Sequence, residues 1–223
     1  MVVGRKNLEE YNFMARDTAA KCRKCRRAGE KLFLKGDRCS SPKCAMMRRA
    51  YAPGVHGKKP GRGLSEYGLQ LAAKQKLKRV YGILERQFRK HFDDIKHKKG
   101  ITGDLLLARL EMRLDNVIYR TGLAASRAQA RQLVNHGLIV VDDKKMTIPS
   151  YEIKIGQTAG INPNKSGKNY FKNLEAALKN KNDFPSWMTF DVSKGQAKIL
   201  AVPNKDEIGV NVDAQIIVEY YSR

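Results

Sequence analysis

The chain has 223 residues, of which 42% are hydrophobic, so it can bury the core of one domain or of two modest ones. Lys and Arg number 44 against 22 Asp and Glu, and residues 1–100 hold 27 of these cations but only nine of the acids. This charge argues against an enzyme for small neutral substrates and favours a protein that neutralises phosphates. Apolar runs are too short to span a membrane and the N-terminus lacks the apolar core of a signal peptide, so we expect a cytoplasmic protein.

All four cysteines lie in one basic segment, as a C-x-x-C pair, Cys22 and Cys25, and a C-x4-C pair, Cys39 and Cys44. Two such pairs can hold one tetrahedral zinc ion, which we expect here, and four protein ligands would make the site structural. The same spacing suits an iron–sulfur cluster, and the thiols could also be unmetallated or oxidised. Zinc would fix a segment too cationic to fold alone and hold a rigid array of phosphate-binding side chains. These are Arg23, Lys24, Arg26, Arg27, Lys43, Arg48 and Arg49.

The basic region continues through a Gly- and Pro-rich loop and two helices. The loop carries three cations that favour an RNA contact over a bland linker: Lys58, Lys59 and Arg62. Ser65 is a suitable N-cap for an amphipathic helix that ends near Gly82. Its outward cations are predicted to be Lys74, Lys78 and Arg79. A second helix is predicted within residues 84–100, where Phe88 and Phe92 belong to an apolar stripe.

Residues 102–122 are predicted to form one helix, with Arg109, Arg113 and Arg120 close together on the helical wheel. A second helix begins at Ser126, where Gln129 completes a capping box.

That second helix carries Arg127 and Arg131 one turn apart and stops near Gly137. "LIVVDDKKMTI" then predicts a strand, a turn and a strand. Two short helices with arginines, followed by a small sheet, favour a compact RNA-binding unit, with RNA ahead of DNA.

The rest of the chain completes an expected α+β fold. Residues 161–187 are predicted to form a loop, a helix and a loop, with Trp187 in the core. "QAKILAVP" and "AQIIVEYYSR" look like strands, so residues 188–223 are expected to form strands that pack back on the fold. We therefore divide the chain into a metal-stapled, mainly helical region (14–100), a two-helix and small-sheet RNA-binding module (101–160) and these two C-terminal segments.

Residues 113–139, "RLDNVIYRTGLAASRAQARQLVNHGLI", resemble the RNA-binding module named after ribosomal protein S four. "CRKCRRAGEKLFLKGDRCSSPKCAMMRR", "APGVHG", "LSEYGLQLAAKQKLKRVYGILERQF" and "IIVEYYSR" resemble the zinc-ligand form of that bacterial ribosomal protein family itself. The resemblance runs from Met14 to Arg223, which leaves residues 1–13 as an expected N-terminal extension.

The resemblance implies a structural constituent of the small ribosomal subunit that binds the 5′ domain of 16S rRNA and nucleates subunit assembly. It also implies contacts with mRNA near the channel through which mRNA enters, and with the neighbouring protein S five, where the interface influences translational accuracy. The loop cations Lys58, Lys59 and Arg62 would be nearest the mRNA. The rRNA-facing surface of the module would contain Arg109, Arg113, Arg127 and Arg131. The chain departs from the family at Asp142-Asp143, which replaces the usual Asn-Gly and suits a tight primed turn less well.

The main alternative is an RNA-modifying enzyme of the pseudouridine synthase type, because such enzymes carry the same module and an essential Asp. Arg113-Leu114-Asp115 resembles the sequence around that Asp. However, Asp115 falls inside the predicted first helix of the module, and the chain has no room for a separate catalytic domain. We therefore expect no catalysis and interpret Asp115 as the partner of a neighbouring arginine. A zinc-dependent DNA-binding regulator is also disfavoured, because no recognition helix or twofold symmetry is evident.

Overall fold

The computed structural model describes residues 17, 19–59, 63–171, 174, 178 and 184–223, so the predicted extension and Arg62 lie outside the described residues. The N-terminal helices are α1 (Lys21–Ala28), α2 (Asp37–Ser40), α3 (Ala45–Arg48), α4 (Glu66–Tyr81), α5 (Glu85–Ile95) and α6 (Thr102–Glu111). They are followed by α7 (Leu114–Arg120), α8 (Arg127–Asn135), β1 (Ile139–Val141), β2 (Lys144–Met146), β3 (Thr158–Ile161), the 3₁₀ turn η2 (Pro163–Lys165), β4 (Met188–Asp191), β5 (Gln196–Ile199), α10 (Lys205–Ile208) and α11 (Ala214–Ser222). None of the described helices is long and apolar enough to cross a membrane.

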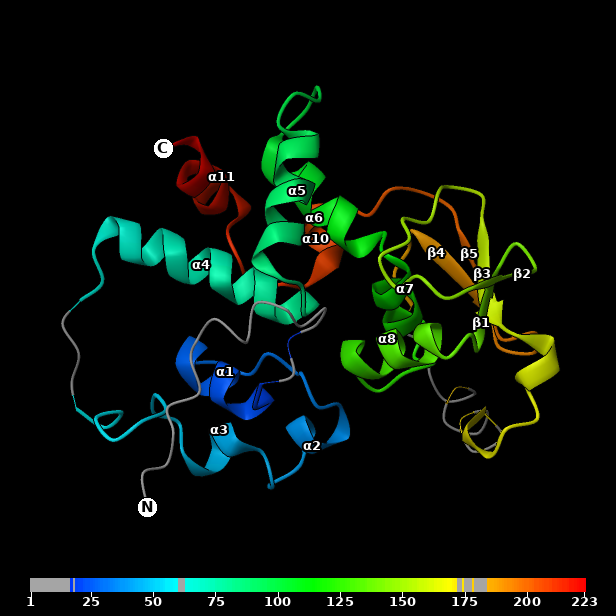
Figure 1. The fold of residues 1–223 in the computed structure, drawn as a ribbon, viewed down its shortest axis with the longest axis horizontal. Helices are drawn as coiled ribbons and strands as arrows, with labels where there is room; N and C mark the ends of the chain where they lie inside the picture. Colours follow the sequence, from blue (N-terminus) through cyan, green and yellow to red (C-terminus); the bar gives the residue numbers. More distant parts are fainter. Residues whose placement is uncertain (1–16, 18, 60–62, 172–173, 175–177, 179–183) are drawn as a thin grey trace, which may run out of the picture.

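Two hydrophobic cores divide the fold. One lies among α4, α5, α6 and α11 and contains Leu77, Phe92 and Ile217, all nearly or fully buried. The other lies between α7, α8 and the sheet, and it contains Val117 and the predicted core residue Trp187. In Figure 1 the short helices α1 to α3 lie below α4, and the sheet lies at the far right beyond α7 and α8. Helices joined to a small antiparallel sheet agree with the expected α+β class.

Capping side chains set the helix starts as predicted. Ser65 caps α4 by accepting a hydrogen bond from the Gly68 N–H at 3.2 Å, and Gly82 ends the helix with a left-handed φ of 65°. Ser126 accepts from the Gln129 N–H at 3.3 Å at the start of α8. The Gln129 side chain returns to the Ala125 N–H at 2.9 Å, one residue before the position of a standard capping box.

The single helix predicted over residues 102–122 is wrong, because the chain breaks between α6 and α7. Arg113 is extended, with φ −69° and ψ 139°, and forms an isolated antiparallel bridge with Glu152. The Ile153 N–H donates to the Met112 carbonyl at 2.9 Å, and the Leu114 N–H donates to the Tyr151 carbonyl at 2.8 Å. These contacts, distant in sequence, replace helical hydrogen bonds and override a continuous helical pattern.

The five strands are all antiparallel, in the order β2-β1-β3-β5-β4. The predicted hairpin of β1 and β2 is present, and its turn residues Asp142 and Asp143 both have positive φ, 46° and 61°. Asp142 stabilises this turn because its carboxylate accepts hydrogen bonds from the Thr158 N–H (2.8 Å), the Thr158 hydroxyl (3.2 Å) and the Gln157 amide (2.7 Å). The Asp-Asp pair therefore forms a primed turn with the help of β3.

The last predicted strand is wrong, because residues 214–222 form the helix α11. Asp213 caps this helix by accepting from the Gln215 N–H at 2.9 Å. Its apolar residues Ala214, Ile217 and Tyr221 recur at helical spacing and face the core between α4 and α6. In the N-terminal segment, residues 31–34 ("KLFL") are irregular, and Phe33 has a left-handed φ of 48°.

Candidate nucleic-acid interface

Seven of the predicted phosphate-binding cations are exposed, all of them in the N-terminal segment and its following loop. They are Arg23, Arg27, Lys43, Arg48, Arg49, Lys58 and Lys59. Three short helices and irregular backbone hold this array, which lies at the lower left of Figure 1. Because these side chains are in solvent, they can meet phosphates without first breaking a buried contact.

Two other cations of this segment have partners within the chain. Lys24 forms an ion pair with Asp17. Arg26 donates to the carbonyls of Tyr51 and Ala52, at 2.9 and 3.2 Å, and its guanidinium lies over the Tyr51 ring at 4.9 Å. Arg26 thus fastens the start of the loop to α1, and its contacts are structural.

The outward position predicted for Lys74 is wrong. Its side chain is 5% exposed and pairs with Glu85 at 2.6 Å while lying 4.3 Å from the centre of the Tyr220 ring. Lys78 also binds Glu85, at 2.9 Å. Burial alone would raise the pKa of Glu85, but hydrogen bonds from Lys74, Lys78 and Tyr221 lower it to about 2. The prediction failed because α11 covers this face of α4.

The four module arginines also contact acidic or aromatic groups of the protein. Arg113 is buried and forms two hydrogen bonds with Asp115, at 2.8 and 3.1 Å, so the expected pairing of Asp115 with an arginine is present. Arg131 approaches the same carboxylate at 3.9 Å, and Arg109 binds Asp94 at 2.6 Å. These four arginines are therefore buried or partly buried and have partners within the chain, while their contact with rRNA stays a prediction.

Arg127 belongs to a buried network around Glu111, at the junction between the two cores. Glu111 has no exposed surface and binds Arg120 through two hydrogen bonds of 2.8 Å. It also accepts from the Tyr81 hydroxyl at 2.6 Å and from the Asn116 amide at 2.8 Å. Burial alone would raise the pKa of Glu111, but the Arg120 hydrogen bonds hold it below its usual value. This network joins α4, α6 and α7 and keeps the carboxylate charged.

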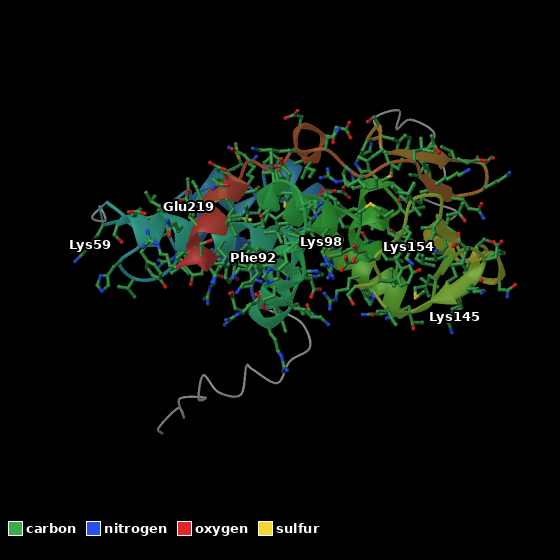
Figure 2. All side chains as sticks on the ribbon, turned by 90° about the horizontal axis from the view of Figure 1, so that it is seen from above. Lys59, Phe92, Lys98, Lys145, Lys154 and Glu219 are labelled. Carbon is green, nitrogen blue, oxygen red and sulfur yellow. The ribbon has the colours of Figure 1, made fainter. Side chains whose placement is uncertain are left out.

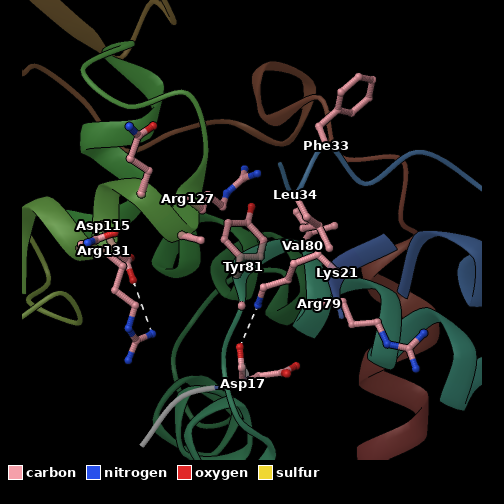
Figure 3. Close-up of a pocket in the computed structure, with 14 residues that line it drawn as sticks. Asp17, Lys21, Phe33, Leu34, Arg79, Val80, Tyr81, Asp115, Arg127 and Arg131 are labelled. Atoms are coloured by element: carbon pink, nitrogen blue, oxygen red, sulfur yellow. Dashed lines mark hydrogen bonds and ion pairs between the residues drawn. The ribbon is translucent and has the colours of Figure 1, made fainter. Parts of the chain in front are cut away.

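A cavity of about 370 Å³ opens where the N-terminal segment, the end of α4 and the start of α8 meet. Its walls include Leu34, Val80 and Tyr81, and its cations are Lys21, Arg79, Arg127 and Arg131. In Figure 3, Arg131 lies at the left of the cavity and Arg79 at the right, with Tyr81 between them. Arg79 is half-buried, and it makes no hydrogen bond or ion pair with another described residue.

The four cysteines line one small cavity together, although they come from separate elements. Cys22 and Cys25 lie on α1, Cys39 lies on α2, and Cys44 precedes α3. The Lys35 N–H donates to the Cys39 sulfur at 3.3 Å, a contact suited to a metal-bound thiolate.

Two observations do not favour a metal in this conformation. Among the described residues, no group of His, Cys, Asp or Glu has the geometry to hold an ion. Burial, and then the neighbouring Cys39 sulfur, raise the pKa of Cys25, which disfavours the thiolate that a metal requires. The donor set fits zinc by chemistry, whereas its arrangement is not that of a closed metal centre.

Sequence reasoning missed a further group of exposed cations on and after α5. They are Arg86, Arg89, Lys90, Lys96, Lys98 and Lys99. The charge run "KHKK" was the available signal. Figure 2 shows that other basic side chains extend along the molecule, from Lys59 at the left to Lys145 and Lys154 at the right.

Comparison with known proteins identifies the family. A model described as "Ribosomal protein S4/S9 N-terminal domain" matches residues 16–111, and one described as "S4 domain" matches residues 112–158. The small ribosomal subunit protein uS4 of Desulforamulus reducens is 47% identical over 211 residues, covering 94% of this chain and 100% of the relative. That of Acetivibrio thermocellus is 50% identical with the same coverage. The chain belongs to the uS4 family. The boundary between the two uS4 family matches falls at the end of α6, where the chain leaves the helix.

Proposed function

We propose that this chain is a structural, rRNA-binding constituent of the small ribosomal subunit and works in the cytoplasm as part of the ribosome. The observation that carries the proposal is the array of seven exposed cations held on short, folded elements, in a chain of the uS4 family. Fixed cations lose less conformational entropy on meeting phosphates than mobile ones, so this array suits a folded RNA. The proposed RNA is the 5′ domain of 16S rRNA, whose binding would help to nucleate subunit assembly.

The relatives are ribosomal proteins, which favours the ribosomal role over that of a pseudouridine synthase. The carboxylate that resembles a catalytic Asp is Asp115, and it is 6% exposed and held by Arg113. Both oxygens of this carboxylate accept hydrogen bonds from Arg113, so its role is to position that guanidinium.

We also propose that one zinc ion is bound by Cys22, Cys25, Cys39 and Cys44. Its support is that the four sulfurs surround one cavity and that a backbone N–H already points at Cys39. Zinc would draw the sulfurs into a tetrahedron and displace their protons, which overcomes the raised pKa of Cys25. An iron–sulfur cluster would need the same four thiolates.

Contacts with mRNA and with protein S five complete the proposal. The observation that supports the mRNA contact is the exposure of Lys58 and Lys59 in the loop after α3. Neighbouring Arg62 lies outside the described residues, and the S five surface is assigned by resemblance alone.

The test is binding to the 5′ domain of 16S rRNA and to an unrelated structured RNA of equal length, across a series of salt concentrations. We expect a preference for the 5′ domain that survives moderate salt, because specific contacts add to counterion release. Equal affinities that collapse together with salt would leave only a general basic RNA binder.

A paired variant tests the array itself. Replacing Arg48 and Arg49 by Gln should flatten the slope of log affinity against log salt by about 1.4 to 1.8, since each lost phosphate contact accounts for about 0.7 to 0.9. Lys194 and Lys198 are also exposed but lie by β5 at the opposite end of the fold, so their replacement by Gln is the charge-matched control. Equal effects of the two pairs would mean that the array has no special part in binding.

A further inference from the structure

The cavity next to Tyr81 is lined by more cations than carboxylates. Four cations line it, Lys21, Arg79, Arg127 and Arg131, against two carboxylates, those of Asp17 and Asp115. Burial, and then the charge of Arg27, lower the pKa of Arg79, while burial and then the charge of Lys24 lower the pKa of Lys21. The charge of Asp17 offsets only part of this effect at Arg79, so an anion in the cavity would stabilise a half-buried guanidinium that no carboxylate binds directly.

The walls of the same cavity are apolar and aromatic. Leu34, Val80 and the ring of Tyr81 line it, and Phe33 stands at its edge with half of its surface exposed (Figure 3). A left-handed φ of 48° holds Phe33 in this position, which is an uncommon conformation for a bulky side chain. An inorganic phosphate would make no use of these apolar surfaces, whereas a nucleotide has both a phosphate and a flat apolar base.

The cavity also has the size and the polar groups that a nucleotide requires. Its volume of about 370 Å³ lies in the range of small-ligand sites. Gln129 and Gln132 line it from α8, and their amides can exchange hydrogen bonds with the edge of a base. Three segments remote in sequence contribute to it, so it exists only when the N-terminal segment and the module are both folded.

We infer that this cavity receives one unstacked nucleotide of the bound RNA, with its phosphate against Arg79 and Lys21 and its base against Phe33 and Leu34. The inference rests on the proposed function, because it requires a folded RNA to be bound. Loops and junctions of RNA present unstacked bases, and proteins commonly hold these against aromatic side chains.

The experiment compares full-length variants in binding to the 5′ domain of 16S rRNA. Phe33→Ala should lower the affinity about five- to 150-fold, the range measured for lost base stacking, while Phe33→Tyr should keep it. Ile155 has 56% of its surface exposed and lies in the module, so Ile155→Ala is the matched control and should bind like the wild type. Gln132→Trp places a bulkier side chain at the α8 wall of the cavity, leaves Phe33 unchanged and should lower the affinity about tenfold.

A photo-crosslinking residue, p-benzoylphenylalanine, at position 33 then identifies the nucleotide. Crosslinks should fall on one nucleotide, and removing its base should cost as much affinity as Phe33→Ala, with no further loss when both changes are combined. Additive losses, scattered crosslinks or unchanged binding by Phe33→Ala would each overturn the inference while leaving the rRNA-binding role intact. If the wild-type protein itself fails to prefer the 5′ domain, the proposed function and the nucleotide site fall together.

Discussion

Glu111 shows how one buried carboxylate connects the two cores of the fold. It lies at the end of α6, where it accepts hydrogen bonds from Tyr81 of α4 and from Asn116 and Arg120 of α7. Burial, and next the charge of Glu111, raise the pKa of Tyr81 well above its usual value, so the hydroxyl stays a donor. The junction therefore depends on a charge that water does not reach.

We predict that Glu111→Gln lowers the free energy of unfolding by about 3–5 kcal/mol, because Arg120 and Arg127 lose the charge that compensates them in a buried site. Urea denaturation measures this change. Glu152→Gln is the matched control: Glu152 is 52% exposed and faces Arg109 at 3.5 Å, so its loss should cost less than about 1 kcal/mol. Similar small losses in both variants would contradict the proposed role of Glu111.

The buried position of His91 makes the stability of the fold depend on pH. Its Nε2 lies 3.4 Å from Arg113, and its Nδ1 is buried without a hydrogen-bond partner among the described residues. Burial, and then the charges of Arg113 and Arg109, lower the pKa of His91 to about 4. The unfolded chain takes up a proton near pH 6.5 and the folded chain does not, so stability falls as the pH drops from about 6.5 towards 4.

We expect His91→Gln to flatten this fall, as measured by urea midpoints between pH 6.5 and 5, above the range where most carboxylates titrate. His97→Gln, which removes an exposed imidazole just after α5, is the control and should keep the wild-type slope. A wild-type slope in His91→Gln would show that His91 is not responsible for the pH dependence.

Among the single elements, the turn between β1 and β2 gives a prediction about stability. Replacing Asp by Gly should have opposite effects on stability at its two adjacent positions. Asp142→Gly removes the three hydrogen bonds to Thr158 and Gln157 and should destabilise the protein by about 1 kcal/mol. Asp143 has a φ of 61°, and its side chain makes no hydrogen bond with the described residues, so Asp143→Gly should stabilise the turn by about 0.5 kcal/mol. Thermal denaturation checks both variants, and changes of the same sign would refute this division of roles.

Elements with local signals could be predicted from the sequence. Ser65 and Gly82 mark both ends of α4, and Ser126 marks the start of α8, because caps depend on residues only three or four positions away. The break at Arg113 and the helix α11 could not be predicted in this way. Arg113 is extended because of residues 149–153, and the apolar run in α11 fits a strand or a helix until its packing against α4 is known.

The residues of the candidate interface could also be predicted only in part from the sequence. Most of the predicted cations in the N-terminal segment are exposed because the segment consists of short elements with little interior, so their composition alone indicated their position. Arg109, Arg113 and Arg120 were placed by a helical wheel that assumed one unbroken helix. Their acidic partners Asp94, Glu111 and Glu152 come from other elements, and no spacing rule reveals pairs of this kind.

For the whole molecule, the two hydrophobic cores are separate. We therefore predict that the module stays folded when the proposed zinc site is lost. In Cys22→Ser with Cys25→Ser, hydrogen exchange should increase over residues 19–48 and remain slow over residues 112–161, because the module has its own core. The wild-type protein should contain one zinc ion per chain, measured by mass spectrometry of the metal, and the variant none.

A chelator provides the control for this prediction. It should loosen residues 19–48 of the wild-type protein to the level of the variant and leave the variant unchanged. Global unfolding of the variant would refute the modular arrangement, and a wild-type protein without zinc would remove the metal from the proposal.

The position of α11 has a consequence for the order in which a newly made chain can fold. The helix contains the final residues of the chain, yet it closes the core around α4 and α6, which are made more than one hundred residues earlier. The module between them has its sheet complete by Ile199, so it can fold first during synthesis. The core around Leu77 and Phe92 therefore stays open on one side until α11 has been made, has left the exit tunnel and can pack against α4 and α6.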